Sequence, residues 1–476
     1  MTDAGFLAPF MFLSLFLLLL TGYPVAFVLG AVGLIFGCIG IWMDVIPFTL
    51  VHAVPERLFG IMRNDTLLAI PFFTLMGLIL ERSGMAEELL ESIGRLLARV
   101  RGGLAFAVII VGALLAATTG VVAASVMAMG LISLPVMLRQ GYSPAISSGV
   151  IMASGTLAQI IPPSLVLIVL ADTLSVPVGD MYIGAMLPSA ILVGLFATFI
   201  AVYALLKPQA LPRMDNPPPI VWRTLLLGLL PPLVLIFLVL GTIFIGLATP
   251  TEAGAMGAAG ALVIALIRRA LSLNLLNQAL TQTARLTCFV MFILLGSSLF
   301  GLVFRALGGD LWVEHLFGNL PGGTVGFLIA VNTLLFILGC FLDFFEIVFI
   351  VVPLLAPLLH QFGLSHVWFG VMVAMNLQTS FLTPPFGFSL FYLKSVAPPS
   401  LPIQKLYQGA VPFIVIQLVM VAMLMVFPDM VLKAGADQAP DDMNNAQVIA
   451  QLDGTSQSEA IKLMMQIADE FSGVRP

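Results

Sequence analysis

Residues 154–170 read SGTLAQIIPPSLVLIVL, which places a proline pair inside an apolar run long enough to cross a membrane. Proline has no backbone N–H, and its ring clashes with the carbonyl of the residue four positions earlier. Pro162 therefore releases the carbonyl of Ala158 from the helix, and Pro163 releases that of Gln159. An unpaired carbonyl in hydrocarbon costs several kcal/mol. The stretch predicts a broken helix whose break meets something cationic or wet.

The composition is that of a polytopic membrane protein. Hydrophobic residues make up 60% of the chain and charged residues 9%, and the mean hydropathy is +1.12. The net charge of −5 and the lack of a basic cluster give no indication of a nucleic-acid partner. The sequence has no GxxxxGK motif and no Cys/His spacing typical of zinc, so it predicts no ATP hydrolysis, no cofactor and no metal other than a coupling ion.

Two apolar runs are too long for one membrane span and awkward for two. These runs, 103–138 and 324–360, have weak centres that read ATTGVVAAS and GCFLDFFE. A half-helix of about 16 residues, rising about 1.5 Å per residue, reaches only mid-membrane. We therefore expect two re-entrant hairpins, which must be buried in protein or line a cavity. The runs expected to span are 5–21, 24–43, 66–80, 144–172, 182–206, 224–247, 251–267, 286–305, 366–394 and 406–428.

The chain contains an internal repeat. VPVGDMYIGAMLP at 176–188 matches LPIQKLYQGAVP at 401–412, and the proline pair of IIPPS has a counterpart in LTPPF. Each pair follows a predicted hairpin, and each half holds five spans, so the second half is expected to be inverted. The predicted parts are repeat 1–206 with its broken helix at 144–172, linker 207–223, repeat 224–428 with its broken helix at 366–394, and polar tail 429–476.

Lysine and arginine predict the orientation. With the N-terminus outside the cytoplasm, thirteen of these residues fall inside and three, Arg57, Arg63 and Arg305, fall outside before the tail. The segment 81–102 is then cytoplasmic. Its sequence EELLESIGRLLARV places leucines on one face and charges on the other, which fits either an amphipathic helix on the membrane or an ordinary connecting helix.

Hydroxyl and carbonyl groups gather at the two breaks and the two hairpin tips. Hard cations take oxygen ligands, and unwound carbonyls suit Na⁺. The positive ends of half-helices favour an anionic substrate. The alternative is that the proline pairs only kink helices and that the hydroxyls join neighbouring helices. The candidate ion-binding residues are Thr118, Thr119, Ser125, Ser154, Gly155, Thr156, Ala158, Gly339, Asp343, Gln378, Thr379, Ser380 and Thr383, beside the prolines Pro162, Pro163, Pro384 and Pro385.

Acidic residues inside a membrane are expensive and are functional candidates by default. Asp343 lies at the second hairpin tip, and Glu346 follows it; the alternative is that this tip is wet. Glu346 and Gln159 are the candidates for substrate binding or coupling. Glu252 starts a helix rich in small residues, where the helix dipole would stabilise its charge.

Five stretches carry a resemblance to a known family: AIPFFTLMGLILERSG, GYSPAISSGVIMASGTLAQIIPPS, ATPTEAGAMGA, LGCFLDFFEIVFIVVPLLAPL and NLQTSFLTPPFGFSLFYL. In this order, within residues 5–430, the chain resembles the large membrane subunit of tripartite ATP-independent periplasmic (TRAP) transporters. The resemblance implies a lipid-embedded multi-pass protein of the bacterial inner membrane. It also implies Na⁺-coupled import of a small organic acid by an elevator mechanism, a small four-helix membrane partner and a periplasmic substrate-binding protein.

The first hairpin tip departs from the Ser-Gly-Ser pattern of many family members and reads TTGVVAASVM. Together with QTSFLTPPFGF, it resembles the branch associated with mannitol, chloroaromatic acids and 2-oxo acids, which favours a small monocarboxylate as substrate.

Two other functions compete with this interpretation. A membrane-embedded subunit of a respiratory or enzyme complex would need paired mid-membrane histidines, a chain of acids and lysines, or a nucleophile with its base. None of these is visible in the sequence, which predicts that the chain is not an enzyme. A passive channel is the closer alternative, and saturable uptake that follows a Na⁺ gradient distinguishes a carrier from it.

Overall fold

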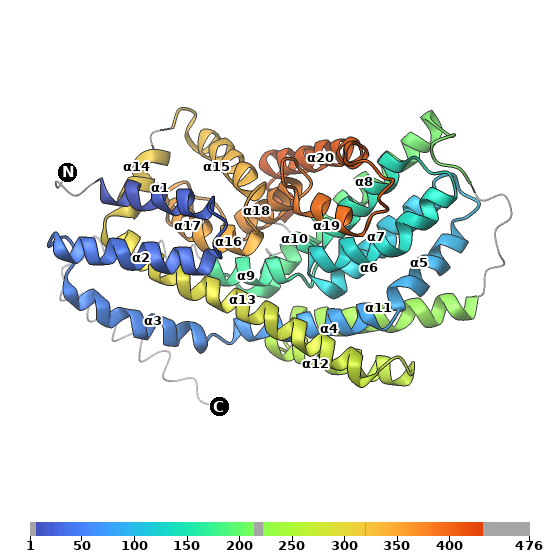
Figure 1. Cartoon of the computed structure of the whole chain (residues 1–476), viewed down its shortest axis with the longest axis horizontal. Coiled ribbons are helices and arrows are strands. Elements are labelled where there is room, and N and C mark those ends of the chain that lie inside the picture. The colour runs from blue at the N-terminus through green and yellow to red at the C-terminus, as the bar shows by residue number, and fades with distance from the viewer. Residues whose placement is uncertain (1–5, 214–221, 319, 432–476) are drawn as a thin grey trace, which may run out of the picture. The chain divides into compact units, whose positions relative to one another are not determined.

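A computed structural model describes residues 6–213, 222–318 and 320–431 (Figure 1). Within them every regular element is helical, so the predicted all-α fold is confirmed. Six of these helices are long and apolar enough to cross a membrane, or up to nine spans result if each bent pair counts as one. Residues 214–221 of the expected linker and 432–476 of the expected tail lie outside the described residues.

The helices form two series. The first comprises α1 (Leu7–Leu19), α2 (Val25–Trp42), α3 (Ala53–Met62), α4 (Ala69–Arg82), α5 (Met85–Leu96), α6 (Gly103–Thr119), α7 (Val122–Arg139), α8 (Pro144–Thr156), α9 (Leu165–Thr173) and α10 (Val178–Leu206). The second comprises α11 (Trp222–Phe244), α12 (Pro250–Ile267), α13 (Leu273–Ala306), α14 (Gly309–Gly318), α15 (Gly323–Gly339), α16 (Phe344–Ile350), α17 (Val352–Gln361), α18 (His366–Ser380), α19 (Phe388–Val396) and α20 (Ile403–Val426). Short 3₁₀ segments occupy η1 (Phe48–His52), η2 (Thr66–Leu68) and η3 (Leu157–Gln159).

Helices of one series pack on helices of the other in matching pairs. α2 packs on α13 while α12 packs on α4, and α5 packs on α11 while α1 packs on α14. Likewise α8 packs on α20 while α10 packs on α18. This exchange of partners is what a two-fold repeat produces. The orientation of each half in the membrane stays a prediction.

Two helix boundaries differ from the sequence expectation. The apolar run 286–305 is only part of α13, which is 34 residues long and begins where Ser272 Oγ accepts a hydrogen bond from the Leu275 N–H at 3.1 Å. The amphipathic segment expected at 81–102 forms a shorter helix, α5. Gly84 (φ 78°) and Gly102 (φ 75°) flank it, and both adopt the left-handed backbone that glycine tolerates.

Both runs with weak centres double back on themselves. The Leu104 N–H, at the start of α6, donates to the Tyr142 hydroxyl, just beyond α7, at 3.3 Å. Similarly the rings of Phe327, in α15, and Phe362, just after α17, stack with centroids 4.6 Å apart. The two ends of each run therefore lie together, and each turn forms a tip. The second arm of the second hairpin is itself bent by 50° between α16 and α17.

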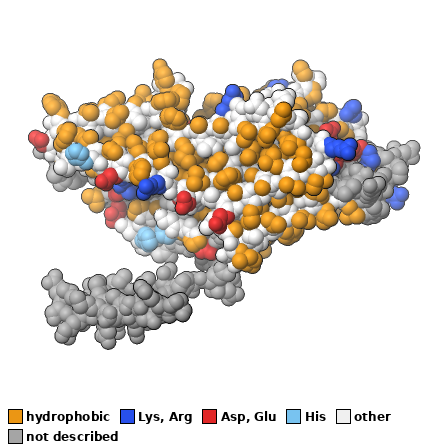
Figure 2. Space-filling model, turned by 90° about the horizontal axis from the view of Figure 1, so that it is seen from below, with side chains coloured by type: hydrophobic (Ala, Val, Ile, Leu, Met, Phe, Trp, Pro, Cys, Tyr) orange, Lys and Arg blue, Asp and Glu red, His pale blue; other side chains and the backbone are white. Residues whose placement is uncertain are grey.

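The outer surface is apolar, as a surface in contact with lipid must be. Figure 2 shows hydrophobic side chains spread over most of one face. Large exposed side chains include Trp42 and Phe237, with 84% and 71% of their surface accessible. In contrast, most residues of α8, α9 and α18 are buried, so the proline-broken helices form the centre of the fold.

Glycines let the broken helices pack closely on the other half. A Cβ on Gly149, in α8, would lie 2.2 Å from the Gly409 carbonyl oxygen, and one on Gly409, in α20, would lie 2.0 Å from that of Ala145. The first half contains the matching Tyr-x-Gly-Ala motif in α10. Its glycine, Gly184, similarly faces Val367 and Val371 of α18. Small residues serve this role in membranes, where close backbone approach replaces the hydrophobic effect between helices.

We expect Gly149→Ala and Gly409→Ala to destabilise the protein by about 1–3 kcal/mol each, since the added methyl group meets backbone that cannot move aside. The measurement is the midpoint of thermal unfolding in detergent. Gly194→Ala in α10 is the matched control, because its Cβ would meet nothing within 4 Å. Equal midpoints for all three variants would contradict the close-packing argument.

Candidate transport site

The two hairpin tips and the two helix breaks border one cavity. Its volume is about 530 Å³. In Figure 1, α6 and α7 approach the centre from one side and α15 from the other, with α9 and α16 between them. The remaining wall comes from the α1–α2 connection and from α13. The lining residues include Gly120, Val121, Asp343, Glu346, Phe381, Tyr392, Tyr23, Leu286 and Phe289.

Four helix N-termini line this cavity. Val122, Leu165, Phe344 and Phe388 are the first residues of α7, α9, α16 and α19, and each of them borders the cavity. The first N–H groups of a helix have no partner within it, and the helix dipole makes this end positive. Asp343 and Glu346 cap α16, whereas the first turns of α7, α9 and α19 contain no acid, so these three ends favour an anion on their side of the space.

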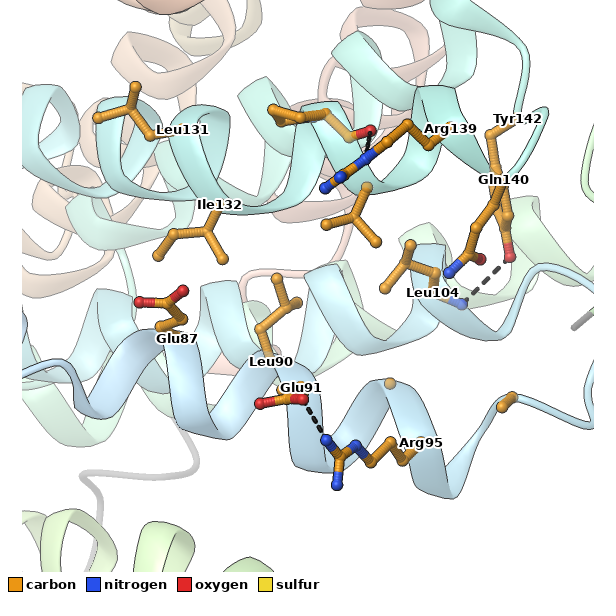
Figure 3. A pocket seen from close by; sticks show the side chains of 14 residues that line it. Glu87, Leu90, Glu91, Arg95, Leu104, Leu131, Ile132, Arg139, Gln140 and Tyr142 are labelled. Atoms are coloured by element: carbon orange, nitrogen blue, oxygen red, sulfur yellow. Dashed lines mark hydrogen bonds and ion pairs between the residues drawn. The ribbon is translucent and has the colours of Figure 1, made fainter. Parts of the chain in front are cut away.

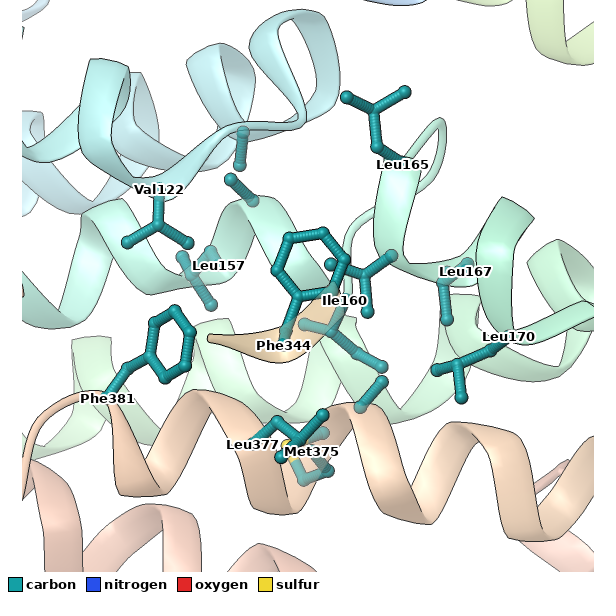
Figure 4. Close-up of a cluster of buried hydrophobic side chains, with 14 of the residues drawn as sticks. Val122, Leu157, Ile160, Leu165, Leu167, Leu170, Phe344, Met375, Leu377 and Phe381 are labelled. Carbon is teal, nitrogen blue, oxygen red and sulfur yellow. The ribbon is translucent and has the colours of Figure 1, made fainter. Parts of the chain in front are cut away.

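Apolar side chains hold the tips in place. Figure 4 shows Phe344 of the second tip lying among Leu157, Ile160 and Phe381 of the two broken helices, with Val122 of the first tip near by. Phe344 and Phe381 are 7% and 2% exposed. The polar groups of the site are therefore held by a tightly packed frame.

At the first break, one of the two carbonyls released by the proline pair accepts a hydrogen bond and the other does not. Ser164 Oγ donates to the Gln159 carbonyl at 2.7 Å, so the expectation that this carbonyl is unpaired is wrong. The serine that follows the proline pair replaces the hydrogen bond that Pro163 removes. The Ala158 carbonyl accepts no hydrogen bond from the described residues, as predicted from Pro162.

The second break is satisfied in a similar way. Pro384 removes the helix donor to the Ser380 carbonyl, which would leave this oxygen unpaired, but the Thr383 N–H donates to it at 2.9 Å instead. Ser389 donates to the Phe381 carbonyl twice, through its N–H at 3.1 Å and its Oγ at 2.7 Å. The Pro162–Pro163 and Pro384–Pro385 bonds are both cis.

Several predicted hydroxyl ligands bond to their own helices. Thr156 Oγ1 donates to the Ala153 carbonyl and Ser380 Oγ to the Leu377 carbonyl, and Thr379 and Thr383 donate in the same manner. Their lone pairs stay available. The two predicted glycines allow close packing. A Cβ on Gly155 would lie 2.3 Å from Val126, and one on Gly339 would lie 2.1 Å from Ser380 Oγ.

Three buried side chains at the breaks carry polar atoms with no partner in the described structure. Ser154 Oγ, both amide atoms of Gln159 and Gln378 Oε1 make no hydrogen bond there, although all three residues are 0% exposed. η3, which holds Gln159, contacts α18, which holds Gln378. Leaving a buried polar atom unpaired costs about 1–3 kcal/mol, so these oxygens are suited to receive an ion or water.

The remaining predicted residues lie at the tips. Thr118 and Thr119 are in the last turn of α6, and their side chains lie outside the described part of the structure. Ser125, in the first turn of α7, is fully buried. Asp343 precedes α16, and its N–H donates to Glu346 Oε2 at 3.0 Å, in a capping box. Both acids face the cavity, and they also stabilise the start of α16.

Besides the donors Ser164 and Ser389, the sequence interpretation missed three polar residues of this region. Gln417 Nε2, in α20, donates to Thr156 Oγ1 at 3.3 Å. Asn376 Nδ2 donates to Asn332 Oδ1 at 2.8 Å, linking α18 to α15. Each of them interrupts an apolar run, and an isolated amide within a membrane span is the signal that could have identified them.

A cavity of about 560 Å³ elsewhere contains none of the predicted site residues. It lies between α5 and the hairpin α6–α7, where Glu87 and Leu90 point toward Ile132 (Figure 3). This cavity adjoins neither a hairpin tip nor a helix break. It is therefore not the candidate site, although it is slightly larger than the 530 Å³ cavity.

Paired hairpins, paired broken helices and a central cavity bordered by helix N-termini define a membrane transporter. The fold is similar to that of the Alcanivorax borkumensis YdaH transporter, whose crystal structure has a TM-score of 0.53 to this chain at 16% identity, covering 80% of this chain and 87% of that one. The comparison supports the fold alone.

Residues 12–430 match the family model of the tripartite ATP-independent periplasmic transporter, DctM component, and the chain belongs to this family. It is therefore a transporter permease rather than an enzyme, and a multi-pass protein of the bacterial inner membrane. The alternative of a respiratory or enzyme subunit is wrong.

Named relatives span several substrates. The C4-dicarboxylate TRAP transporter large permease protein DctM of Pseudomonas aeruginosa is 31% identical over 79% of this chain and 88% of its own length. The sialic acid TRAP transporter large permease protein SiaM of Vibrio cholerae is 27% identical over 87% of this chain and 95% of its own. The isethionate TRAP transporter permease protein DctMQ of Oleidesulfovibrio alaskensis is 27% identical over 86% of this chain and 63% of its own.

We expect Ser164→Ala to destabilise the protein by about 1–3 kcal/mol, because it leaves the buried Gln159 carbonyl without a donor. Ser389→Ala should cost less, since the Phe381 carbonyl keeps the Ser389 N–H. Thermal unfolding midpoints test this order. Ser395→Ala removes an exposed hydroxyl bonded to the Tyr392 carbonyl and is the control. A larger loss for Ser395→Ala than for Ser164→Ala would contradict the assignment.

Proposed function

We propose that this chain is the permease of a Na⁺-driven importer of a small organic acid, and that it works with a small four-helix membrane subunit and a periplasmic substrate-binding protein. The proposal is carried by the cavity lined by four helix N-termini, together with the buried, unpaired oxygens at the two helix breaks. The first feature suits an anion, and the second suits the coupling ion.

Sodium is the ion that these ligands favour. Ser154 Oγ, the Gln159 and Gln378 amide oxygens and the Ala158 carbonyl are neutral oxygen ligands, which suit a hard cation. Among the described residues no group of three His, Cys, Asp or Glu could hold a metal ion. A site built from neutral oxygens next to a helix break is the arrangement that secondary transporters use for Na⁺.

The substrate is an organic anion. The relatives are named for C4-dicarboxylates, sialic acid and isethionate, all of which carry a carboxylate or a sulfonate. These names do not support the branch of mannitol, chloroaromatic acids and 2-oxo acids. The anionic group is the property that the cavity recognises, and the 2-oxo acid assignment rests only on the TTGVVAASVM and QTSFLTPPFGF stretches.

An elevator movement would separate the hairpins from the wall they face. Leu286 and Phe289 of α13 and Tyr23 of the α1–α2 connection form one side of the cavity, and the two tips form the other. The orientation predicted from lysine and arginine places the α1–α2 connection on the cytoplasmic side. In this orientation the cavity faces the cytoplasm, and sliding the hairpin domain along α13 would expose it to the opposite side.

Uptake by reconstituted protein tests the function. The complete three-part system in vesicles should accumulate a labelled C4-dicarboxylate or another organic acid with saturable kinetics, and only with an inward Na⁺ gradient. The permease alone should transport poorly at micromolar substrate. Non-saturable flux that ignores the Na⁺ gradient would identify a passive channel, and full uptake by this chain alone would contradict the partner assignment.

We expect Gln159→Leu and Gln378→Leu to weaken Na⁺ affinity by about tenfold or more, the effect of losing about 1.4 kcal/mol of binding energy. Without Na⁺, their unfolding midpoints should be unchanged or higher, because an unpaired buried amide is replaced by an apolar group. The measurement is the Na⁺ dependence of the thermal midpoint in detergent. Thr283→Val, which removes an unpaired buried hydroxyl of α13, is the control. Equal Na⁺ responses in all variants would exclude these ligands.

A further inference from the structure

We propose that a vestibule lined by two arginines, Arg57 and Arg305, and by His360 and His366 holds the carboxylate of the substrate before it enters the transport cavity. This inference deepens the proposed function and rests on it. The vestibule consists of two adjoining cavities of about 370 Å³ and 560 Å³, which share Thr173, Arg305 and Pro353. Arg57 and Asp172 line the first, and the two histidines line the second.

The vestibule lies along the same helix as the transport cavity. Leu286 and Phe289 of α13 border the transport cavity, whereas the part of α13 from Leu294 to Arg305 borders the vestibule. On the facing helix α16, Phe345 lines the transport cavity and Phe349 lines the vestibule, with ring centroids 6.3 Å apart. On this face the two spaces are thus lined by neighbouring, stacked aromatic rings.

The charges in the vestibule leave capacity for an anion. Arg57 is exposed and makes no ion pair or hydrogen bond with the described residues. Arg305 Nε forms an ion pair with Asp310 Oδ2 at 3.7 Å, which is too long for a strong hydrogen bond, and 44% and 41% of the two side chains are exposed. The lining carboxylate, Asp172, accepts a hydrogen bond from Asn64 Nδ2 at 2.7 Å. The rings of His360 and His366 lie 4.6 Å apart and add two further donors.

The placement of the two arginines is unusual for this chain. Arg57 and Arg305 come from different halves of the sequence and belong to the three basic residues that the predicted orientation leaves outside the cytoplasm. Arginine matches the planar geometry of a carboxylate with two parallel N–H donors. A cleft lined by positive charge also raises the local concentration of an anion and speeds its entry. Both effects would act on the substrate after it leaves its binding protein.

Thiol labelling at Thr173 measures the potential in the vestibule without any transport. Thr173→Cys is placed in a chain whose native cysteines, Cys38, Cys288 and Cys340, are replaced by alanine. The labelling rates with anionic sulfonatoethyl and cationic trimethylammonioethyl methanethiosulfonate are compared on the full-length protein in lipid nanodiscs. The ratio of the anionic to the cationic rate reports the local charge.

We expect Arg57→Gln to lower this ratio by about tenfold and Arg305→Gln to lower it similarly, as nearby unit charges do at a partly hydrated surface. Arg63→Gln is the matched control, because Arg63 lies over the Phe59 ring at 4.4 Å and lines neither cavity. Arg57 is exposed and unpaired, so its variant decides the question even if Arg305→Gln does not fold. A ratio unaffected by Arg57→Gln would overturn the proposal.

Protection from labelling tests carboxylate binding itself. Succinate should slow labelling of the Thr173→Cys variant by the uncharged reagent methyl methanethiosulfonate, and neutral succinamide at the same ionic strength should not. Arg57→Gln should abolish this protection. Equal effects of succinate and succinamide would overturn the proposal. Neither measurement uses Na⁺, partner subunits or uptake, so a failure of the proposed transport function would be seen separately in the vesicle experiment.

Discussion

The hydrogen bonds that four prolines remove from two buried helices are the constraint on which this structure depends. In hydrocarbon no water is present to donate a hydrogen bond to a freed carbonyl. The chain must therefore provide a donor, or the oxygen must bind a ligand. Ser164 and Ser389 supply donors at the two breaks. The Ala158 carbonyl is left without a partner in the described structure, and unpaired oxygens of Ser154 and Gln159 lie in the same segment. The break is thus stabilised on one side and left open to a ligand on the other.

The same breaks create the cavity in which we propose that the anion binds. A helix that stops at mid-membrane and restarts presents a new N-terminus there, and a re-entrant hairpin does the same at its tip. Two of each give the four N-termini that line the 530 Å³ cavity. The polar backbone that is costly in lipid therefore lines the cavity, because the surrounding helices bury its other sides.

The positions of the helix breaks and hairpin tips were predictable from the sequence, because they depend on local chemistry. The pairs Pro162–Pro163 and Pro384–Pro385 interrupt their helices as expected, and Gly120 and Asp343 lie at the two hairpin tips. A proline pair alone does not decide this, because Pro231 and Pro232 lie within the continuous helix α11. The donors to the freed carbonyls were missed although Ser164 is adjacent to its proline pair, since the same hydroxyl could equally have served a neighbouring helix. The Gln417–Thr156 and Asn332–Asn376 bonds join residues far apart in sequence, so only tertiary packing determines them. The start of α13 was missed because its first turns are polar and apolar periodicity does not reveal them.

The acids at the second tip make the site asymmetric. Glu346 lies in the first turn of α16, whereas the first turns of α7, α9 and α19 contain no acid. Its carboxylate accepts the Asp343 N–H and compensates the positive end of α16, which the other three helices leave uncompensated. The positive potential is therefore greatest on the side of the cavity formed by α7, α9 and α19. In the proposed function, an anion on that side would lie apart from the two carboxylates, which would then be free to face the coupling cation.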